Sequence, residues 1–186
     1  MSRNVEIKAS CPDLNPVRGG AARLASSPGQ IVDQRDTFFV VPTGRLKVRE
    51  FADGSGELIA YERSDQKEPK TSEYTRIECR EAAALIHALK RVLALRGVVV
   101  KRREVFLVGR TRIHLDQVED LGSFVELEVV LSEGGSFENG VREADELLQA
   151  LGLPRSALTA GAYIDLLEAR STGAARSSGN APSVVE

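Results

Sequence analysis

Short runs in which apolar and charged residues alternate recur along this sequence, and they constrain its fold more than any other feature. Successive side chains of a β-strand point to opposite faces, so each run predicts a strand with one apolar and one charged face. Such strands are predicted at residues 5–9, 36–41, 44–50, 57–63, 75–78, 98–108, 111–118 and 124–131. Turn signals at 42–44 and 108–110 favour antiparallel pairing of neighbouring strands.

Four segments carry apolar residues at helical spacing instead. They are residues 13–25, 80–95, 139–151 and 156–169, of which 80–95 has the most regular stripe. Asn139 is a candidate N-cap of the third helix and Gly152 a candidate stop signal. Because each helix must bury its apolar stripe, the helices are expected to cover one face of the sheet, which predicts an α+β fold.

Composition limits the kind of protein. A chain of 186 residues with 42% hydrophobic residues and a net charge of −2 suits one soluble domain and argues against a nucleic-acid partner. With neither a long apolar run nor an N-terminal apolar segment, and two cysteines in no metal or redox spacing, we expect a reduced, cytoplasmic protein without a membrane partner. Residues 1–170 are predicted as the domain and residues 171–186 as a disordered tail.

The charges on the predicted strands are sorted. The basic side chains on the charged faces are Lys8, Arg45, Lys47, Arg49, Arg63, Lys101, Arg103 and Arg112, and the acidic ones are Glu6, Asp116, Glu126 and Glu128. This is an excess of four positive charges in a chain whose net charge is negative. Concentrated positive charge favours a polyanion site, because arginine forks match phosphate oxygens. The alternative is an ordinary solvated sheet face.

Glu126 and Glu128 lie two residues apart on one predicted strand face, with Cα atoms about 6.6 Å apart. Two carboxylates there repel each other unless a cation lies between them. Oxygen ligands without a His or Cys cluster suit Mg²⁺ or Mn²⁺. The alternative is a set of buried salt bridges to neighbouring basic residues. His114, on the same charged face, could contact a ligand or pair with Asp116.

Six motifs in a fixed order resemble the CYTH superfamily, which contains class IV adenylyl cyclases, thiamine triphosphatases and related triphosphate tunnel enzymes. The motifs are V-E-I-K (5–8), L-K-V-R (46–49), Y-E-R (61–63), V-x-K-x-R (99–103), R-x-H-L-D (112–116) and G-S-F-V-E-L-E (122–128). The resemblance covers about residues 3–168. It implies an eight-stranded antiparallel β-barrel-like triphosphate tunnel, charged inside and covered outside by helices.

The resemblance also implies roles for individual residues. The triphosphate-binding residues would be Lys8, Lys47, Arg49, Arg63, Lys101, Arg103 and Arg112. The catalytic residues would be Lys8, Arg63 and Lys101, and the metal ligands Glu6, Asp116, Glu126 and Glu128. The cofactor would be Mg²⁺ or Mn²⁺, the partner a triphosphate such as ATP or tripolyphosphate, and a homodimer is a further candidate assembly.

Two positions depart from the family pattern. The first strand reads Asn4-Val5-Glu6-Ile7-Lys8 where the family has E-x-E-x-K, so one carboxylate is missing and a second metal ion loses a ligand. The segment Asp36-Thr37-Phe38-Phe39 lacks the tyrosine hydroxyls of the family's D-T-Y-Y, which weakens a lysine–tyrosine hydrolytic pair.

Three functions stay open at this point. The first is a metal-dependent enzyme acting on a nucleoside triphosphate, most like class IV adenylyl cyclase, which converts ATP to cyclic AMP and pyrophosphate. The second is a hydrolase of tripolyphosphate or an organic triphosphate. The third is a non-catalytic polyphosphate- or nucleotide-binding module. Identification of the products made from these substrates would separate the three.

Overall fold

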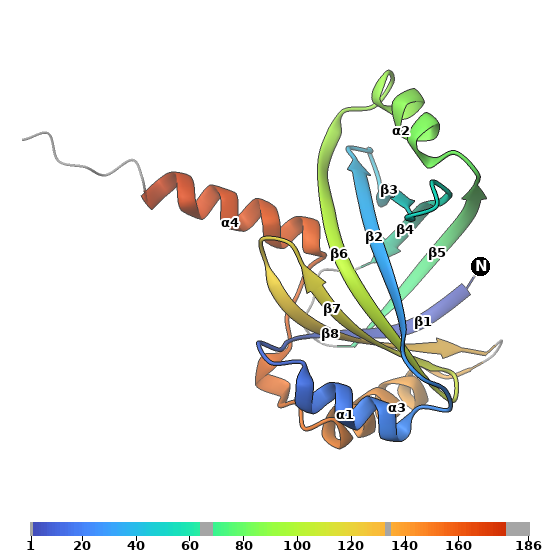
Figure 1. Cartoon of the computed structure of the whole chain (residues 1–186), viewed down its shortest axis with the longest axis vertical. Coiled ribbons are helices and arrows are strands. Elements are labelled where there is room, and N and C mark those ends of the chain that lie inside the picture. Colours follow the sequence, from blue (N-terminus) through green and yellow to red (C-terminus); the bar gives the residue numbers. More distant parts are fainter. Residues whose placement is uncertain (1, 64–68, 133–134, 178–186) are drawn as a thin grey trace, which may run out of the picture.

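The computed structural model describes residues 2–63, 69–132 and 135–177, with the side chains of residues 2, 3, 63, 70–73 and 173–177 outside the description. Eight strands dominate this part of the chain (Figure 1). They are β1 (Ser2–Ser10), β2 (Gln30–Phe39), β3 (Arg45–Glu50), β4 (Gly56–Arg63), β5 (Lys70–Cys79), β6 (Leu95–Val108), β7 (Thr111–Val118) and β8 (Gly122–Leu131). Every predicted strand is therefore confirmed, with longer ends at several positions.

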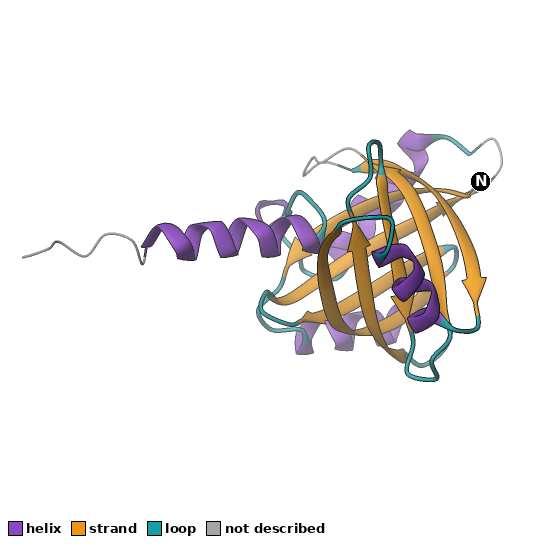
Figure 2. Cartoon of the chain, turned by 90° about the horizontal axis from the view of Figure 1, so that it is seen from above, coloured by secondary structure: helices purple, strands orange, loops and turns teal. Residues whose placement is uncertain are grey.

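The strands close into an antiparallel barrel in the order β1-β5-β4-β3-β2-β6-β7-β8, with β8 pairing back to β1. The turn between β6 and β7 contains Gly109, whose φ of 56° lies in the left-handed region that suits glycine. Figure 2 shows the strands curving around a central space with helices outside them. The predicted α+β fold, an eight-stranded antiparallel barrel with helices packed outside, is confirmed.

Outside the barrel, the described residues form four α-helices. They are α1 (Asn15–Leu24), α2 (Ala82–Lys90), α3 (Phe137–Ala150) and α4 (Tyr163–Ser177), with a short 3₁₀ helix, η1 (Arg155–Ala157), before α4. Helices α1 and α3 pack against the outward apolar residues of β1, β7 and β8, and this is the largest core. A second core joins α4 to β2, β6 and β8, and a third joins α2 to β2 and β3. Most buried apolar strand residues therefore face the helices, and the charged faces line the interior together with a few apolar residues, Phe38, Ile59, Val99 and Val105.

Two predicted helices have different bounds in the structure. The predicted helix 80–95 ends at Lys90, because Leu95 pairs with Phe39 in the barrel. The predicted helix 156–169 is divided, because Gly161 adopts a φ of 80° and Asp165 accepts a hydrogen bond from the Ala162 amide at the start of α4.

Three further boundaries differ. Helix α3 is capped by the side chain of Ser136, which accepts from the Asn139 amide, so Asn139 is not the N-cap. Strand β2 starts at Gln30, because its first residues pair with β6. Helix α4 extends through Ser177, residues 178–186 lie outside the described residues, and the domain boundary at residue 170 stays a prediction.

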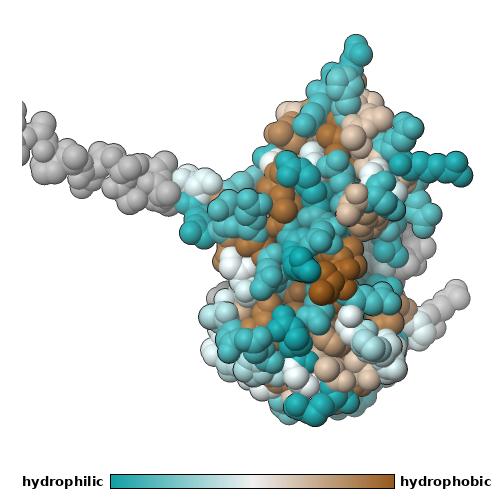
Figure 3. All heavy atoms as spheres, in the orientation of Figure 1, coloured by the Kyte–Doolittle hydropathy of each residue, from teal (hydrophilic) through white to brown (hydrophobic). Residues whose placement is uncertain are grey.

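Figure 3 shows mostly hydrophilic residues on the face drawn, with apolar residues in small groups along the barrel. No helix in the described part of the chain is long and apolar enough to cross a membrane.

Candidate functional site

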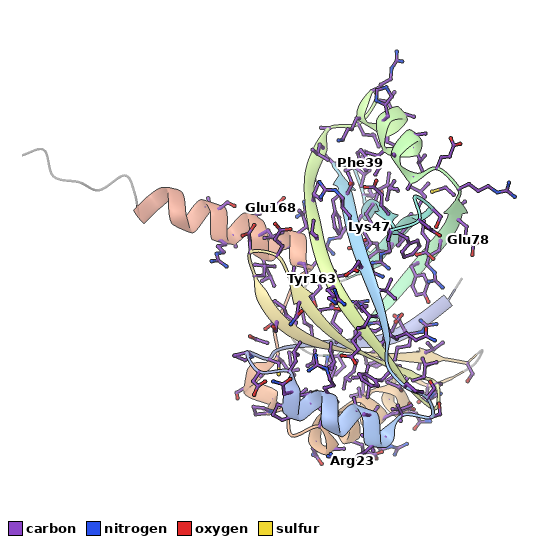
Figure 4. The ribbon with its side chains drawn as sticks, viewed as in Figure 1. Arg23, Phe39, Lys47, Glu78, Tyr163 and Glu168 are labelled. Atoms are coloured by element: carbon purple, nitrogen blue, oxygen red, sulfur yellow. The ribbon has the colours of Figure 1, made fainter. Side chains whose placement is uncertain are left out.

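The barrel encloses a cavity of about 370 Å³. Its lining comes from all eight strands and from the start of α4: Asn4, Glu6, Lys8, Gln34, Asp36, Phe38, Lys47, Arg49, Ile59, Tyr61, Tyr74, Arg76, Val99, Lys101, Arg103, Val105, Arg112, His114, Glu126, Glu128, Ala162 and Tyr163. Figure 4 shows Lys47 among the barrel strands and Tyr163 at the base of α4, whereas Arg23 and Glu78 lie on the outside. The charged strand faces thus meet in one enclosed space.

A cationic cluster, which we define as Asp36, Lys47, Arg49 and Lys101, occupies the β2, β3 and β6 side of this space. Arg49 donates to both carboxylate oxygens of Asp36, at 2.7 and 2.9 Å, and Lys47 Nζ donates to Oδ2 at 2.6 Å. Lys101 Nζ lies 3.7 Å from the same oxygen. Three cations therefore converge on one buried carboxylate.

Burial and the mutual charges set the proton affinities in this cluster. Burial alone would raise the pKa of Asp36, but Arg49, Lys47 and Lys101 together hold that pKa well below its ordinary value. Burial lowers the pKa of Lys47 to about 7, against the opposing attraction of Asp36. Burial and then the charge of Arg103 lower the pKa of Lys101 to about 8.

A mixed cluster lies on the β1, β7 and β8 side, with one member from β6, and its three lysine and arginine side chains face three carboxylates. We define it as Lys8, Arg103, Arg112, His114, Asp116, Glu126 and Glu128. Arg103 donates to Asp116 at 2.6 and 2.5 Å and to Glu126 at 2.5 Å. Lys8 lies 3.2 Å from Glu126, and Arg112 donates to Glu128 at 3.2 Å. Lys8 and Glu126 are register partners on β1 and β8, which explains their contact.

Tyr163 lies where the two clusters meet, and the sequence analysis did not identify it as a site residue. Its ring centroid is 3.9 Å from Lys8 Nζ and 5.2 Å from Lys101 Nζ, and its hydroxyl donates to Asp116 at 2.8 Å. Lys8 also donates to the Gly161 carbonyl at 3.0 Å. The family's lysine–tyrosine pair would place a tyrosine in the segment at Phe38 and Phe39. In this structure Tyr163 contacts Lys8 from α4 instead, and it does so through the face of its ring.

Three buried polar atoms on the cavity lining have no hydrogen-bond partner in the described part of the chain. They are Asn4 Oδ1, Gln34 Oε1 and His114 Nδ1. His114 lies 3.8 Å from both Glu126 and Glu128, and its pKa is lowered by burial and by Arg103. Since buried polar groups are nearly always hydrogen-bonded, these atoms are suited to contact a molecule held in the cavity.

The structure brings most of the predicted site residues together. Those that line the cavity are Lys8, Lys47, Arg49, Lys101, Arg103, Arg112, Glu6, Glu126 and Glu128. Asp116 differs, because it is fully buried behind the lining, where Arg103 and Tyr163 occupy its oxygens. Arg63 ends β4, and its side chain lies outside the described residues.

Sequence reasoning missed other lining residues, namely Gln34, Asp36, Tyr61, Tyr74, Arg76 and Tyr163. Gln34, Asp36 and Phe38 share one face of β2 at the spacing of two residues expected for a strand. Extending the predicted strand toward Gln30 would have shown that face.

Oxygen donors for a metal ion gather on β1 and β8. Glu6 and Glu128 are register partners, both line the cavity, and Asn4 Oδ1 on the same face of β1 lacks a partner. Such a set fits Mg²⁺ or Mn²⁺. Among the described residues, however, no group of three or more His, Cys, Asp or Glu side chains is arranged to hold a metal, and Glu126 is held by Lys8 and Arg103.

Comparison with known families identifies the class of this protein. The CYTH domain matches residues 2–163, most of the chain, and the chain belongs to this family. The resemblance seen in the sequence motifs is therefore confirmed. A search of curated proteins gives no match to the chain.

Solved structures with the same fold come from distant organisms. The PH1012 protein of Pyrococcus horikoshii OT3 is 24% identical with a TM-score of 0.78, over 88% of this chain and 98% of its own. A candidate adenylate cyclase of Vibrio parahaemolyticus is 18% identical with a TM-score of 0.71, over 89% and 97%. The Hippeastrum protein HpAC1, a candidate adenylyl cyclase with a dominant triphosphatase activity, is 15% identical with a TM-score of 0.58, over 83% and 89%.

Proposed function

We propose that this chain is a metal-dependent enzyme that acts on a nucleoside triphosphate inside the barrel, most like a class IV adenylyl cyclase. The observation that carries the proposal is the convergence of Lys47, Arg49 and Lys101 on one buried carboxylate that lines the barrel cavity. Fixed cations in such a space bind phosphate oxygens and stabilise the charge that develops as a phosphoryl group is transferred. Membership of the CYTH family supports this proposal.

Aromatic and apolar residues on the β4 and β5 wall favour a substrate with an organic group. Ile59, Tyr61 and Tyr74 line the cavity there, and the two tyrosines are register partners. A nucleoside beside this wall would leave its triphosphate among the cations. The ribose 3′-oxygen would then attack the α-phosphorus, and pyrophosphate would leave as cyclic AMP forms.

A divalent ion, held by Glu6, Glu128 and the Asn4 amide oxygen, would neutralise phosphate charge. Lys8, Arg103 and Lys101 would bind and orient the phosphates, and Arg63 and Arg112 would extend this contact. Glu126 and Asp116 serve best as the counter-ions that hold Lys8 and Arg103 in place.

Hydrolysis of tripolyphosphate or an organic triphosphate is the second candidate. The cationic cluster requires phosphate oxygens alone, so a ligand without a nucleoside satisfies it equally well. Water would then be the nucleophile. Non-catalytic binding and assembly as a homodimer remain predictions.

The test is to incubate the protein with ATP, tripolyphosphate and thiamine triphosphate, each with Mg²⁺ or Mn²⁺, and to identify the products. Cyclic AMP with pyrophosphate supports the cyclase, and release of orthophosphate supports the hydrolase. An Arg49→Ala protein, prepared in the same way, excludes a contaminating phosphatase. Binding without turnover would favour the non-catalytic binding module. Absence of binding would overturn the cyclase, the hydrolase and the binding module alike.

A further inference from the structure

Asp36 makes contacts that a phosphoryl group would also make. Arg49 approaches its two oxygens through Nε and Nη2, in the paired geometry that guanidinium groups use for carboxylate and phosphate alike. Lys47 and Lys101 approach from the neighbouring strands. Asp36 itself is only 1% exposed, so its charge is neutralised by these side chains and not by water.

The cluster is arranged by strand pairing. Asp36 is the register partner of Arg49 on β3. Phe38, the next residue on the same face of β2, is the partner of Lys47. Lys101 reaches the same oxygen from β6, on the other side of β2. Removing the central carboxylate would leave three buried positive charges facing one another.

We infer that Asp36 is a positioning residue, which holds Lys47, Arg49 and Lys101 converged in the cavity and extends to higher pH the range over which Lys47 stays charged, and so sets the pH range over which the cavity accepts a triphosphate. This inference rests on the proposed function. It assigns a role to an acid that would otherwise only compete with the ligand for its cations.

Other charged groups around the cluster act on its members. Glu57 on β4 attracts Arg49, Arg103 on β6 repels Lys101, and Asp116 on β7 and Glu126 on β8 attract Lys101, whose Nζ lies 5.2 Å from the Tyr163 ring of α4. Asp36 is the acid that Lys47 and Arg49 contact directly. The lowered pKa of Lys47, about 7 even beside Asp36, indicates that without this carboxylate the lysine would lose its proton at a lower pH still.

The experiment compares tripolyphosphate affinity of the wild type and of Asp36→Asn by calorimetry between pH 6 and pH 8, at constant ionic strength and in EDTA. In the variant, Lys47 loses its proton at a lower pH than in the wild type and must be protonated again when tripolyphosphate binds. The ratio of variant to wild-type affinity should therefore fall about tenfold between pH 6 and pH 8. The ionisation of tripolyphosphate itself cancels in this ratio. Asp145→Asn, which removes the partner of Arg155 on the outside of the barrel, is the matched control and should give a constant ratio.

A constant ratio for Asp36→Asn would overturn the inference, because a merely structural role lowers affinity equally at each pH. Failure of the wild type to bind tripolyphosphate would instead overturn the proposed function. If Asp36→Asn does not fold, proton uptake on binding at pH 8, measured in two buffers of different ionisation enthalpy, replaces it. Wild type should take up more protons than Lys47→Arg, whose charge does not titrate, and equal uptake would contradict the inference.

Discussion

The two halves of the cavity use the same kinds of side chain in different proportions. In the cationic cluster three bases share Asp36, whereas in the mixed cluster Lys8, Arg103 and Arg112 face Asp116, Glu126 and Glu128. The first half has positive charge left for a ligand, and the second is nearly neutralised within the protein. The comparison shows that a count of basic residues does not locate an anion site, because the local ratio of bases to acids decides it.

Strand register produces this difference. On β1, β7 and β8 the partners across the sheet are Lys8 with Glu126 and Arg112 with Glu128, so each base meets an acid. On β2 and β3 Asp36 faces Arg49 and Lys47 lies opposite Phe38, while Arg49 has a second acidic register partner, Glu57 on β4. Charge in the mixed cluster is therefore used for internal pairing, whereas Lys47 and Lys101 of the cationic cluster have no acid as a register partner.

The largest expected effect tests the metal role of the mixed cluster. Glu128→Gln should abolish metal-dependent turnover while tripolyphosphate binding in EDTA stays equal or tightens, because one negative charge leaves the cavity. The fold should survive, because a glutamine can still accept from the two groups that donate to Glu128, the Asn4 side-chain amide and Arg112, and Arg112 is one-third exposed. Turnover with Mn²⁺, affinity in EDTA and melting temperature are the measurements, with Glu143→Gln outside the barrel as control. An undiminished rate would exclude Glu128 as a metal ligand.

Next in size is the loss of stability when the mixed cluster is broken. Arg103→Ala leaves Asp116 and Glu126 without their shared buried partner, so the free energy of unfolding should fall by about 3–5 kcal/mol. Urea denaturation measures this. Arg102→Ala, which changes the next residue on the outward face of β6, is the matched control and should have little effect. Equal stability of both variants would refute the structural role assigned to Arg103.

A smaller effect is expected on ligand affinity in the cationic cluster. Arg49→Ala should weaken tripolyphosphate binding by about 1.5–3 kcal/mol, because a paired phosphate contact is lost, while Lys47 and Lys101 still neutralise Asp36. Arg112→Ala should weaken binding less, because Glu128 already engages that side chain. Calorimetry at one pH ranks the losses of affinity in the two variants. A larger loss for Arg112→Ala would show that the mixed cluster, and not the cationic cluster, contributes more to binding.

The last effect concerns pH and stability. The pKa values of Lys47 and Lys101, about 7 and about 8, lie below that of an unfolded lysine, about 10.4. Between these values the unfolded chain binds more protons than the folded one, so the free energy of unfolding should rise with pH from about 7 to about 10. Lys47→Arg should reduce that rise, and urea denaturation at pH 7 and pH 9.5 measures it. An identical rise in both proteins would show that Lys47 does not contribute.

Much of the cavity wall could be predicted from single strands. The alternation of Glu6 and Lys8, or of Lys101 and Arg103, places each pair on one face whatever the strand's neighbours are. Asp116 was assigned to that inward face, yet a side chain on an inward face can still be covered by its neighbours, here Arg103 and Tyr163. Burial within a face depends on packing that no one strand contains.

The sequence by itself determined the strands, their charged faces and, through its ordered motifs, the family and the closed barrel. Only the tertiary structure decided which charged side chains pair with one another. Asp36 meets Arg49, Lys47 and Lys101 through the pairing of β2 with β3 and β6, and Tyr163 reaches Lys8 because Gly161 turns the chain into α4. The physical reason is that periodicity is a local property of a strand, whereas the partner of a charge is set by register and closure between segments distant in the chain.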